Sequence, residues 1–127
     1  MKSKIMWITF VLVAALVVFT GCDMATEHTT ITTNEAIYMM ANQNVVIVDV
    51  RTPAEFSSGH IPGAISLELN EIRYMVNFVI LDVNQTILVY CRSGVRSAEA
   101  SAILAEMGYR NVYDFGGILS WTGDIQY

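Results

Sequence analysis

The amino-acid sequence predicts an α/β fold in which helices cover both faces of a central, mostly parallel sheet of five strands. Two observations support this prediction. Short apolar runs rich in β-branched residues alternate with stretches of helical periodicity, which is the pattern of successive β-α-β units. In addition, the runs at 45–48 and 87–90 are continuous rather than alternating, as expected of strands buried on both faces.

The first elements of the domain are an edge strand, a helix and a core strand. Residues 30–32 fit a short edge strand, and Thr32 with Glu35 forms a capping box for a helix that runs to about Ala41. The run 44–50 is the strongest strand signal in the chain, because its centre is apolar and β-branched.

A short helix, a turn, a short strand and a third helix follow. The short helix is predicted at 53–56, the turn at 59–63 and the strand at 64–67. The third helix runs from Asn70 to about Phe78. Four apolar side chains share its helical period: Ile72, Met75, Val76 and Val79.

The second core strand leads into the last helix and the last strand. Residues 86–90 are apolar and suit a buried strand, and Ser97–Met107 is predicted to form a helix that Gly108 ends. A final strand is expected at 111–114. Three alanines at helical spacing indicate close packing of the last helix on the sheet: Ala98, Ala102 and Ala105.

The segment between this strand and helix contains the strongest candidate for a reactive group, Cys91. A thiol at this junction lies where backbone N–H groups converge and the helix dipole is positive. Arg92 and Arg96 add positive charge, and Gly94 permits the positive φ that a tight loop needs. Each feature favours the thiolate, so we interpret Cys91 as a reactive cysteine rather than a structural one.

This segment, Cys91-Arg92-Ser93-Gly94-Val95-Arg96-Ser97, resembles the active-site loop of the rhodanese family of sulfurtransferases. The segments 48–64 and 115–121 resemble the family's other two signatures, in the expected order. The resemblance covers about 31–121 and implies a rhodanese-like fold for residues 30–127. It further implies that Cys91 is the catalytic nucleophile. The backbone N–H groups of the loop would then hold its sulfur anion: Arg92, Ser93, Gly94, Val95 and Arg96.

Other residues of the two flanking signatures are expected to support the site. The four-residue spacing of Arg51 and Glu55 predicts a local ion pair. Asp49 either fixes the loop by accepting hydrogen bonds or caps the following helix. We interpret His60 as a turn residue rather than a general base. Three residues of the last signature are expected to shape and cover the rim of the site: Gly116, Gly117 and Trp121.

The resemblance implies transfer of a sulfane sulfur from a donor such as thiosulfate to cyanide or a thiol, through a persulfide on Cys91. Cysteine-dependent phosphatases of the cell-cycle type resemble this fold but place five residues between cysteine and arginine. Here Cys91 and Arg96 are separated by four residues, which favours a single sulfur atom over a phosphate. An interaction module and a carrier that passes sulfur to a partner protein are the remaining alternatives.

Residues 1–21 are predicted to be a lipoprotein signal peptide. Two lysines precede an apolar run at 5–19, which is short for a membrane-spanning helix of about 20 residues. Thr20 and Gly21 before Cys22 resemble the cleavage box of bacterial lipoproteins, so Cys22 would be lipidated and begin a tether over 22–29. An uncleaved anchor is the alternative. Either form would hold the domain at a membrane, outside the cytoplasm in the cell envelope.

The charge and the cysteine count exclude several kinds of partner. After the signal, the chain has five arginines against twelve acidic residues, a net charge of −7, which argues against binding of nucleic acid or anionic lipid. His28 and His60 lie far apart, and two cysteines make neither a disulfide framework nor a metal site. We expect a monomer without metal or cofactor, whose partners are a small sulfur-containing anion or thiol and a membrane.

Overall fold

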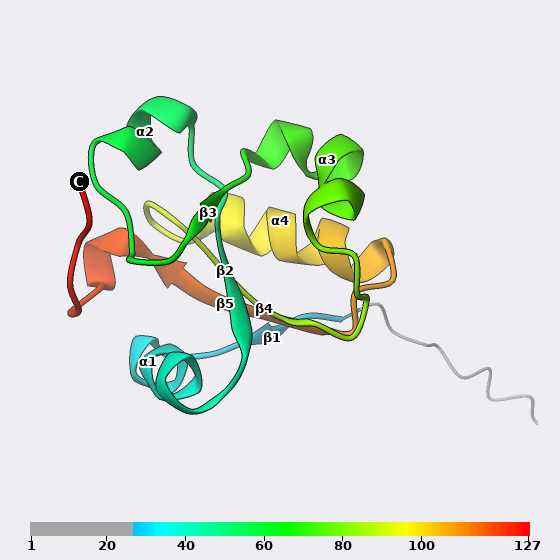
Figure 1. Cartoon of the computed structure of the whole chain (residues 1–127), viewed down its shortest axis with the longest axis horizontal. Coiled ribbons are helices and arrows are strands. Elements are labelled where there is room, and N and C mark those ends of the chain that lie inside the picture. Colours follow the sequence, from blue (N-terminus) through cyan, green and yellow to red (C-terminus); the bar gives the residue numbers. More distant parts are fainter. Residues whose placement is uncertain (1–26) are drawn as a thin grey trace, which may run out of the picture.

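The computed structural model describes residues 27–127, which form a five-stranded sheet with helices on both faces (Figure 1). Every pairing between strands is parallel, in the order β1-β5-β4-β2-β3. The strands are β1 Thr29–Thr30, β2 Val45–Asp49, β3 Ile65–Ser66, β4 Thr86–Cys91 and β5 Asn111–Gly117. The predicted α/β class is confirmed, and the sheet is fully rather than mostly parallel.

The helices form two layers around this sheet. They are α1 Thr33–Asn42, α2 Pro53–Ser57, α3 Ile72–Val79 and α4 Val95–Glu106, with 3₁₀ turns η1 Leu69–Glu71 and η2 Ile118–Ser120. In Figure 1, α1 lies below the sheet, and α3 and α4 lie above it. No helix within 27–127 is long and apolar enough to cross a membrane. The predicted signal peptide, 1–21, and Cys22 lie outside the described residues.

Helix α1 begins where the sequence predicts because its cap is fully formed. The Thr32 hydroxyl accepts a hydrogen bond from the Glu35 N–H at 3.2 Å, and the Glu35 carboxylate accepts one from the Thr32 N–H at 2.7 Å. These two bonds satisfy N–H groups that a helix start otherwise leaves free. The capping box is confirmed.

The central strand β4 is buried on both faces, as its continuous apolar run predicts. Side chains alternate along a strand, so Ile87, Val89 and Cys91 join the core under α3 and α4. Leu88 and Tyr90 join the core on the α1 side instead. The thiol at the end of β4 therefore lies in the same layer as α4.

Two predicted helix faces are only partly correct. In α3, Ile72 and Val76 are fully buried, whereas Met75 and Val79 are 44% and 49% exposed. The helix is apolar on more than one side, so its period alone does not identify the buried face.

Helix α4 begins at Val95 rather than Ser97, because Gly94 serves as its N-cap. Its fully buried positions include two serines, and Ala98 and Ala102 are only half-buried. The stripe against the sheet is Ser97, Ala100, Ser101, Leu104 and Ala105. The predicted close packing of α4 on the sheet is correct, but of the three predicted alanines only Ala105 lies in this stripe.

The contributions of the buried and the exposed face of α3 to the free energy of unfolding can be measured. Ile72→Ala removes a fully buried side chain and should lower the free energy of unfolding by about 2–5 kcal/mol in a urea titration. Met75→Ala, one turn further on the exposed side, should change it by no more than about 0.5 kcal/mol. Equal losses for the two variants would contradict this packing.

Candidate active site

Cys91 is the last residue of β4 and is only 1% exposed. The strand register shifts between Val89 and Cys91, after which Cys91 pairs with Gly117 of β5. Such irregularities re-aim side chains near functional sites. The Gly94 N–H donates a hydrogen bond to the Cys91 sulfur at 3.0 Å, with Gly94 at φ +106°. The predicted positive φ is confirmed, and the chain folds back so that backbone N–H groups face the sulfur.

Ser97 fixes this loop from the first turn of α4. Its hydroxyl is fully buried and lies 3.0 Å from the carbonyl of Gly94 and 3.2 Å from that of Gly116. The side chain therefore links the loop to the end of β5. The sequence analysis assigned no role to Ser97; its only signal there was its place at the end of the loop motif.

The Cys91 pKa is set by two opposing effects. Burial raises the pKa, because it disfavours the charged thiolate. Hydrogen bonds from Ser97 and from the N–H groups of Gly94 and Ser93 lower it and prevail, so the pKa lies below its ordinary value. The expected lowering is confirmed, and the hydrogen bonds of the loop are its main cause. The pKa of Arg96 lies above its ordinary value, mainly because of its hydrogen bonds to Glu55 and to a smaller extent because of Cys91.

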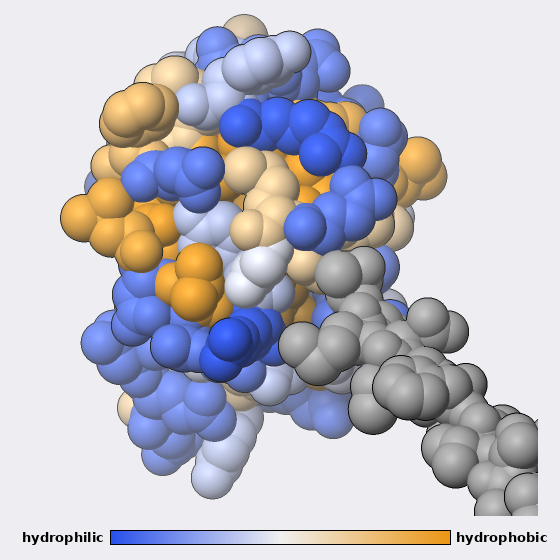
Figure 2. All heavy atoms as spheres, turned by 90° about the vertical axis from the view of Figure 1, so that its right-hand side faces the viewer, coloured by the Kyte–Doolittle hydropathy of each residue, from blue (hydrophilic) through white to orange (hydrophobic). Residues whose placement is uncertain are grey.

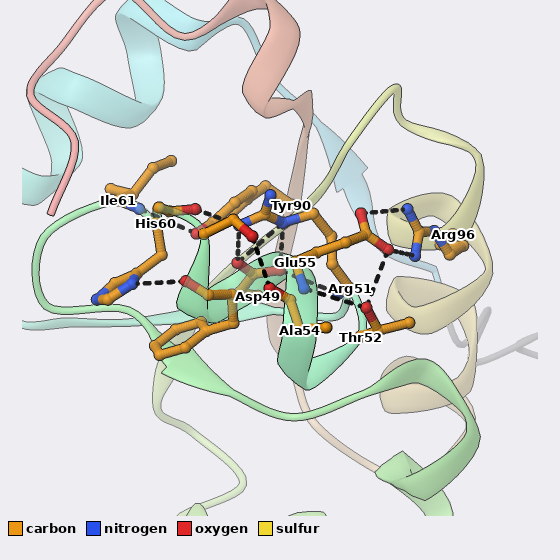
Figure 3. A network of polar contacts seen from close by, with 12 residues as sticks. Asp49, Arg51, Thr52, Ala54, Glu55, His60, Ile61, Tyr90 and Arg96 are labelled. Atoms are coloured by element: carbon orange, nitrogen blue, oxygen red, sulfur yellow. Dashed lines mark hydrogen bonds and ion pairs between the residues drawn. The ribbon is translucent and has the colours of Figure 1, made fainter. Parts of the chain in front are cut away.

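Arg96 is held by Glu55 of α2, as Figure 3 shows. Its two terminal nitrogens donate to the two carboxylate oxygens at 2.8 and 3.0 Å. This contact is the main reason that the pKa of Glu55 falls to about 2. The predicted pair between Arg51 and Glu55 is wrong: Arg51 precedes the N-cap Thr52, so helical four-residue spacing does not apply to it.

Arg51 pairs instead with Asp49, and both side chains are buried. The guanidinium donates to Asp49 at 2.7 Å and to the Gly59 carbonyl at 2.7 Å. Burial alone would lower the pKa of Arg51, but Asp49 raises it above the ordinary value. Asp49 thus accepts hydrogen bonds from Arg51 and none from the loop around Cys91, residues 91–97, and the alternative that it caps α2 is wrong because Thr52 does so.

Arg92 is the exposed cation of the loop. Its side chain makes no hydrogen bond or ion pair with any residue of the described part of the chain, although its carbonyl accepts one from the Leu119 N–H at 3.2 Å. That carbonyl lies so close to Gly117 that a Cβ there would sit only 2.0 Å from its oxygen. Gly117 therefore shapes the rim, as predicted, by allowing the loop to approach β5.

Neither His60 nor Trp121 forms a hydrogen bond with Cys91. The His60 ring stacks on Phe56 at 3.8 Å, and its Nδ1 is 3.0 Å from the Phe56 carbonyl, which fits the predicted turn residue. Trp121 packs against Phe115 in the α1 layer. Within 27–127, no three histidine, cysteine, aspartate or glutamate side chains are grouped to hold a metal ion.

Comparison with known proteins gives one consistent result. Residues 32–124 match the model of the rhodanese-like domain. The chain is 39% identical over 71 residues to thiosulfate sulfurtransferase PspE of Escherichia coli (strain K12), covering 56% of this chain and 68% of that protein. It is 40% identical over 81 residues to a sulfurtransferase of Allochromatium vinosum, covering 63% and 74%.

A solved structure agrees with these sequence relatives. The structure described as a rhodanese with anions from E. coli superposes with a TM-score of 0.61 at 34% identity, covering 64% of this chain and 95% of the other. The signature segments, strands β2 to β5 and the loop around Cys91 all lie within the matched residues, and only the edge strand β1 lies before them. This chain belongs to the rhodanese-like family.

Proposed function

We propose that this chain is a sulfurtransferase that carries a sulfane sulfur on Cys91. The observation that carries this proposal is the Cys91 thiol itself, at the end of β4 with the Gly94 N–H at 3.0 Å and a lowered pKa. Ionised sulfur at a helix start is a good nucleophile. The relatives named thiosulfate sulfurtransferase and sulfurtransferase support the same activity.

The transfer proceeds in two balanced steps. The Cys91 thiolate attacks the outer sulfur of thiosulfate; a new S–S bond forms as the S–S bond of the donor breaks and sulfite leaves with the electron pair. Cyanide or a thiolate then attacks the outer sulfur of the persulfide and regenerates the Cys91 thiolate. The N–H groups of the loop stabilise the anion on the sulfur in both states.

Arg92 is the group that would attract an anionic donor. It is exposed at the rim, whereas the charge of Arg96 is already balanced by Glu55. Arg96 therefore acts by bracing the loop against α2. This arrangement disfavours the phosphatase alternative, which needs the arginine at the end of the loop to bind a phosphate. The same persulfide chemistry would serve a carrier whose acceptor is a protein thiol.

Replacement of the nucleophile tests the mechanism. The wild-type protein incubated with thiosulfate should gain the mass of one sulfur atom and lose it to cyanide, as followed by intact-mass spectrometry. Cys91→Ser should show neither event, because a serine hydroxyl is not ionised at neutral pH. Sulfur transfer by a folded Cys91→Ser variant would disprove the mechanism.

The activity of the wild type should fall as the pH drops through the thiol pKa, because protonation removes the nucleophile.

A second substitution tests how the donor is attracted. Arg92→Ala should lower kcat/KM for thiosulfate by about tenfold, the effect of losing one charge-assisted contact. Arg110→Ala removes another exposed arginine, just before β5 at the opposite edge of the sheet, and serves as the matched control. Similar kcat/KM values for the two variants would show that Arg92 does not recruit the donor.

We further propose that Cys22 carries a diacylglyceryl group and holds the domain at a membrane outside the cytoplasm. The support is the apolar run at 5–19 followed by Thr20-Gly21-Cys22. Two acyl chains give stable attachment, whereas one gives marginal binding. Metabolic labelling with a fatty acid should mark the wild type and not Cys22→Ala; equal labelling of both would refute the anchor.

A further inference from the structure

Exposed hydrophobic side chains are concentrated in one short segment of the domain. Of the ten large hydrophobic residues that are exposed in the described chain, six lie between Tyr74 and Val83. Four of them, which we call the edge patch, lie in the last turn of α3 and in the segment that follows it. The edge patch consists of Phe78, Val79, Leu81 and Val83, which are 78, 49, 82 and 40% exposed. Single exposed apolar residues are ordinary, but several of them at one end of a domain are typical of an interaction surface.

The edge patch lies at the end of the sheet where the described chain begins. Val83 accepts a hydrogen bond from the Arg110 N–H at 2.9 Å, just before β5 starts. Strand β1 begins at Thr29 and runs parallel to β5. The starts of β1, β4 and β5 thus share one edge with the patch, at the right of Figure 1. Figure 2 views this end and shows exposed hydrophobic side chains on it.

The proposed lipid anchor brings this edge close to a membrane. Five residue steps separate Cys22 from Glu27, the first described residue, and even a fully extended chain of that length spans only about 17 Å. The edge that carries Glu27 must then lie near the bilayer surface. Cys91 is at the opposite end of its strand, at the carboxyl edge of the sheet.

From these positions we infer that the edge patch rests in the interface of the bilayer to which Cys22 is anchored, and that Cys91 faces away from it. This inference rests on the proposed anchor. Phenylalanine, leucine and valine side chains suit the boundary between headgroups and acyl chains. The net charge of −7 after the signal makes a zwitterionic surface the matching partner, because anionic lipid would repel the domain. The patch thereby orients a domain that the lipid alone would leave free to rotate.

A tryptophan reporter tests this orientation on the lipidated product that begins at Cys22 and therefore lacks Trp7. Its mass first establishes the diacylglyceryl group, and it is then placed in phosphatidylcholine vesicles with brominated acyl chains, which quench nearby tryptophan. Phe78→Trp is made together with Trp121→Phe, so that the reporter lies in the edge patch. The protein with native Trp121, which follows β5 at the other edge, is the matched control. Leu81→Trp supplies a second reporter in the patch.

We expect the patch reporters to lose at least about half of their emission, and Trp121 to lose little. Equal, weak quenching at both edges in a protein of verified lipid mass would overturn the orientation and leave the anchor standing. Unquenched patch reporters in a protein that dimerises, with the dimer lost in Phe78→Asp, would assign the patch to a second copy instead. Absence of the lipid mass would refute the anchor and this inference together, while sulfur transfer would be unaffected.

Discussion

The buried ion pair between Asp49 and Arg51 is the interaction on which the arrangement of the site depends. Asp49 ends β2, and Arg51 reaches from it to the Gly59 carbonyl, so the pair holds both ends of the segment that contains α2. The guanidinium also lies over the Tyr90 ring, 5.7 Å from its centre. Removing one partner of a buried pair leaves an uncompensated charge and typically costs about 3–5 kcal/mol. Neither residue bonds to Cys91, yet both position α2, which presents Glu55 to Arg96.

The loop around Cys91 relies on hydrogen bonds more than on free charge. Arg96, which the sequence suggests would add positive charge at the thiol, is paired with Glu55, whereas the N–H groups of the loop lower the thiol pKa, as the sequence predicts. Backbone N–H groups aimed at a buried sulfur are fixed in place and are screened little by salt. An exposed arginine such as Arg92 is screened more strongly. Under the proposed function, the stability of the thiolate and the attraction of a donor would therefore have different physical origins.

The sequence predicts this fold well because its strands and caps are local signals. The β-branched run of β2 and the Thr32–Glu35 capping box need no tertiary context, and all five predicted strands form. The sequence-based predictions are wrong at positions where tertiary contacts determine the structure. Helix α3 is apolar on two sides, so only packing selects Ile72 over Met75. Arg51 lies one residue before the N-cap of α2, so the four-residue spacing that pairs side chains within a helix does not apply to Arg51 and Glu55. Ser97 is a polar residue on a buried face, which an apolar pattern cannot reveal.

The near-complete burial of Cys91 would limit which sulfur donors and acceptors can reach the thiol. A sulfur atom added to this thiol stands about 2 Å farther from the backbone than the thiol itself, the length of an S–S bond. Under the proposed mechanism, the cysteine sulfur would stay buried while the outer sulfur of the persulfide lies closer to the solvent. Bulky oxidants and large thiols would meet a shielded nucleophile, and an acceptor would need to touch only the outermost atom. The burial of the thiol would then select for small donors, whereas the transferred sulfur would be accessible to acceptors of many sizes.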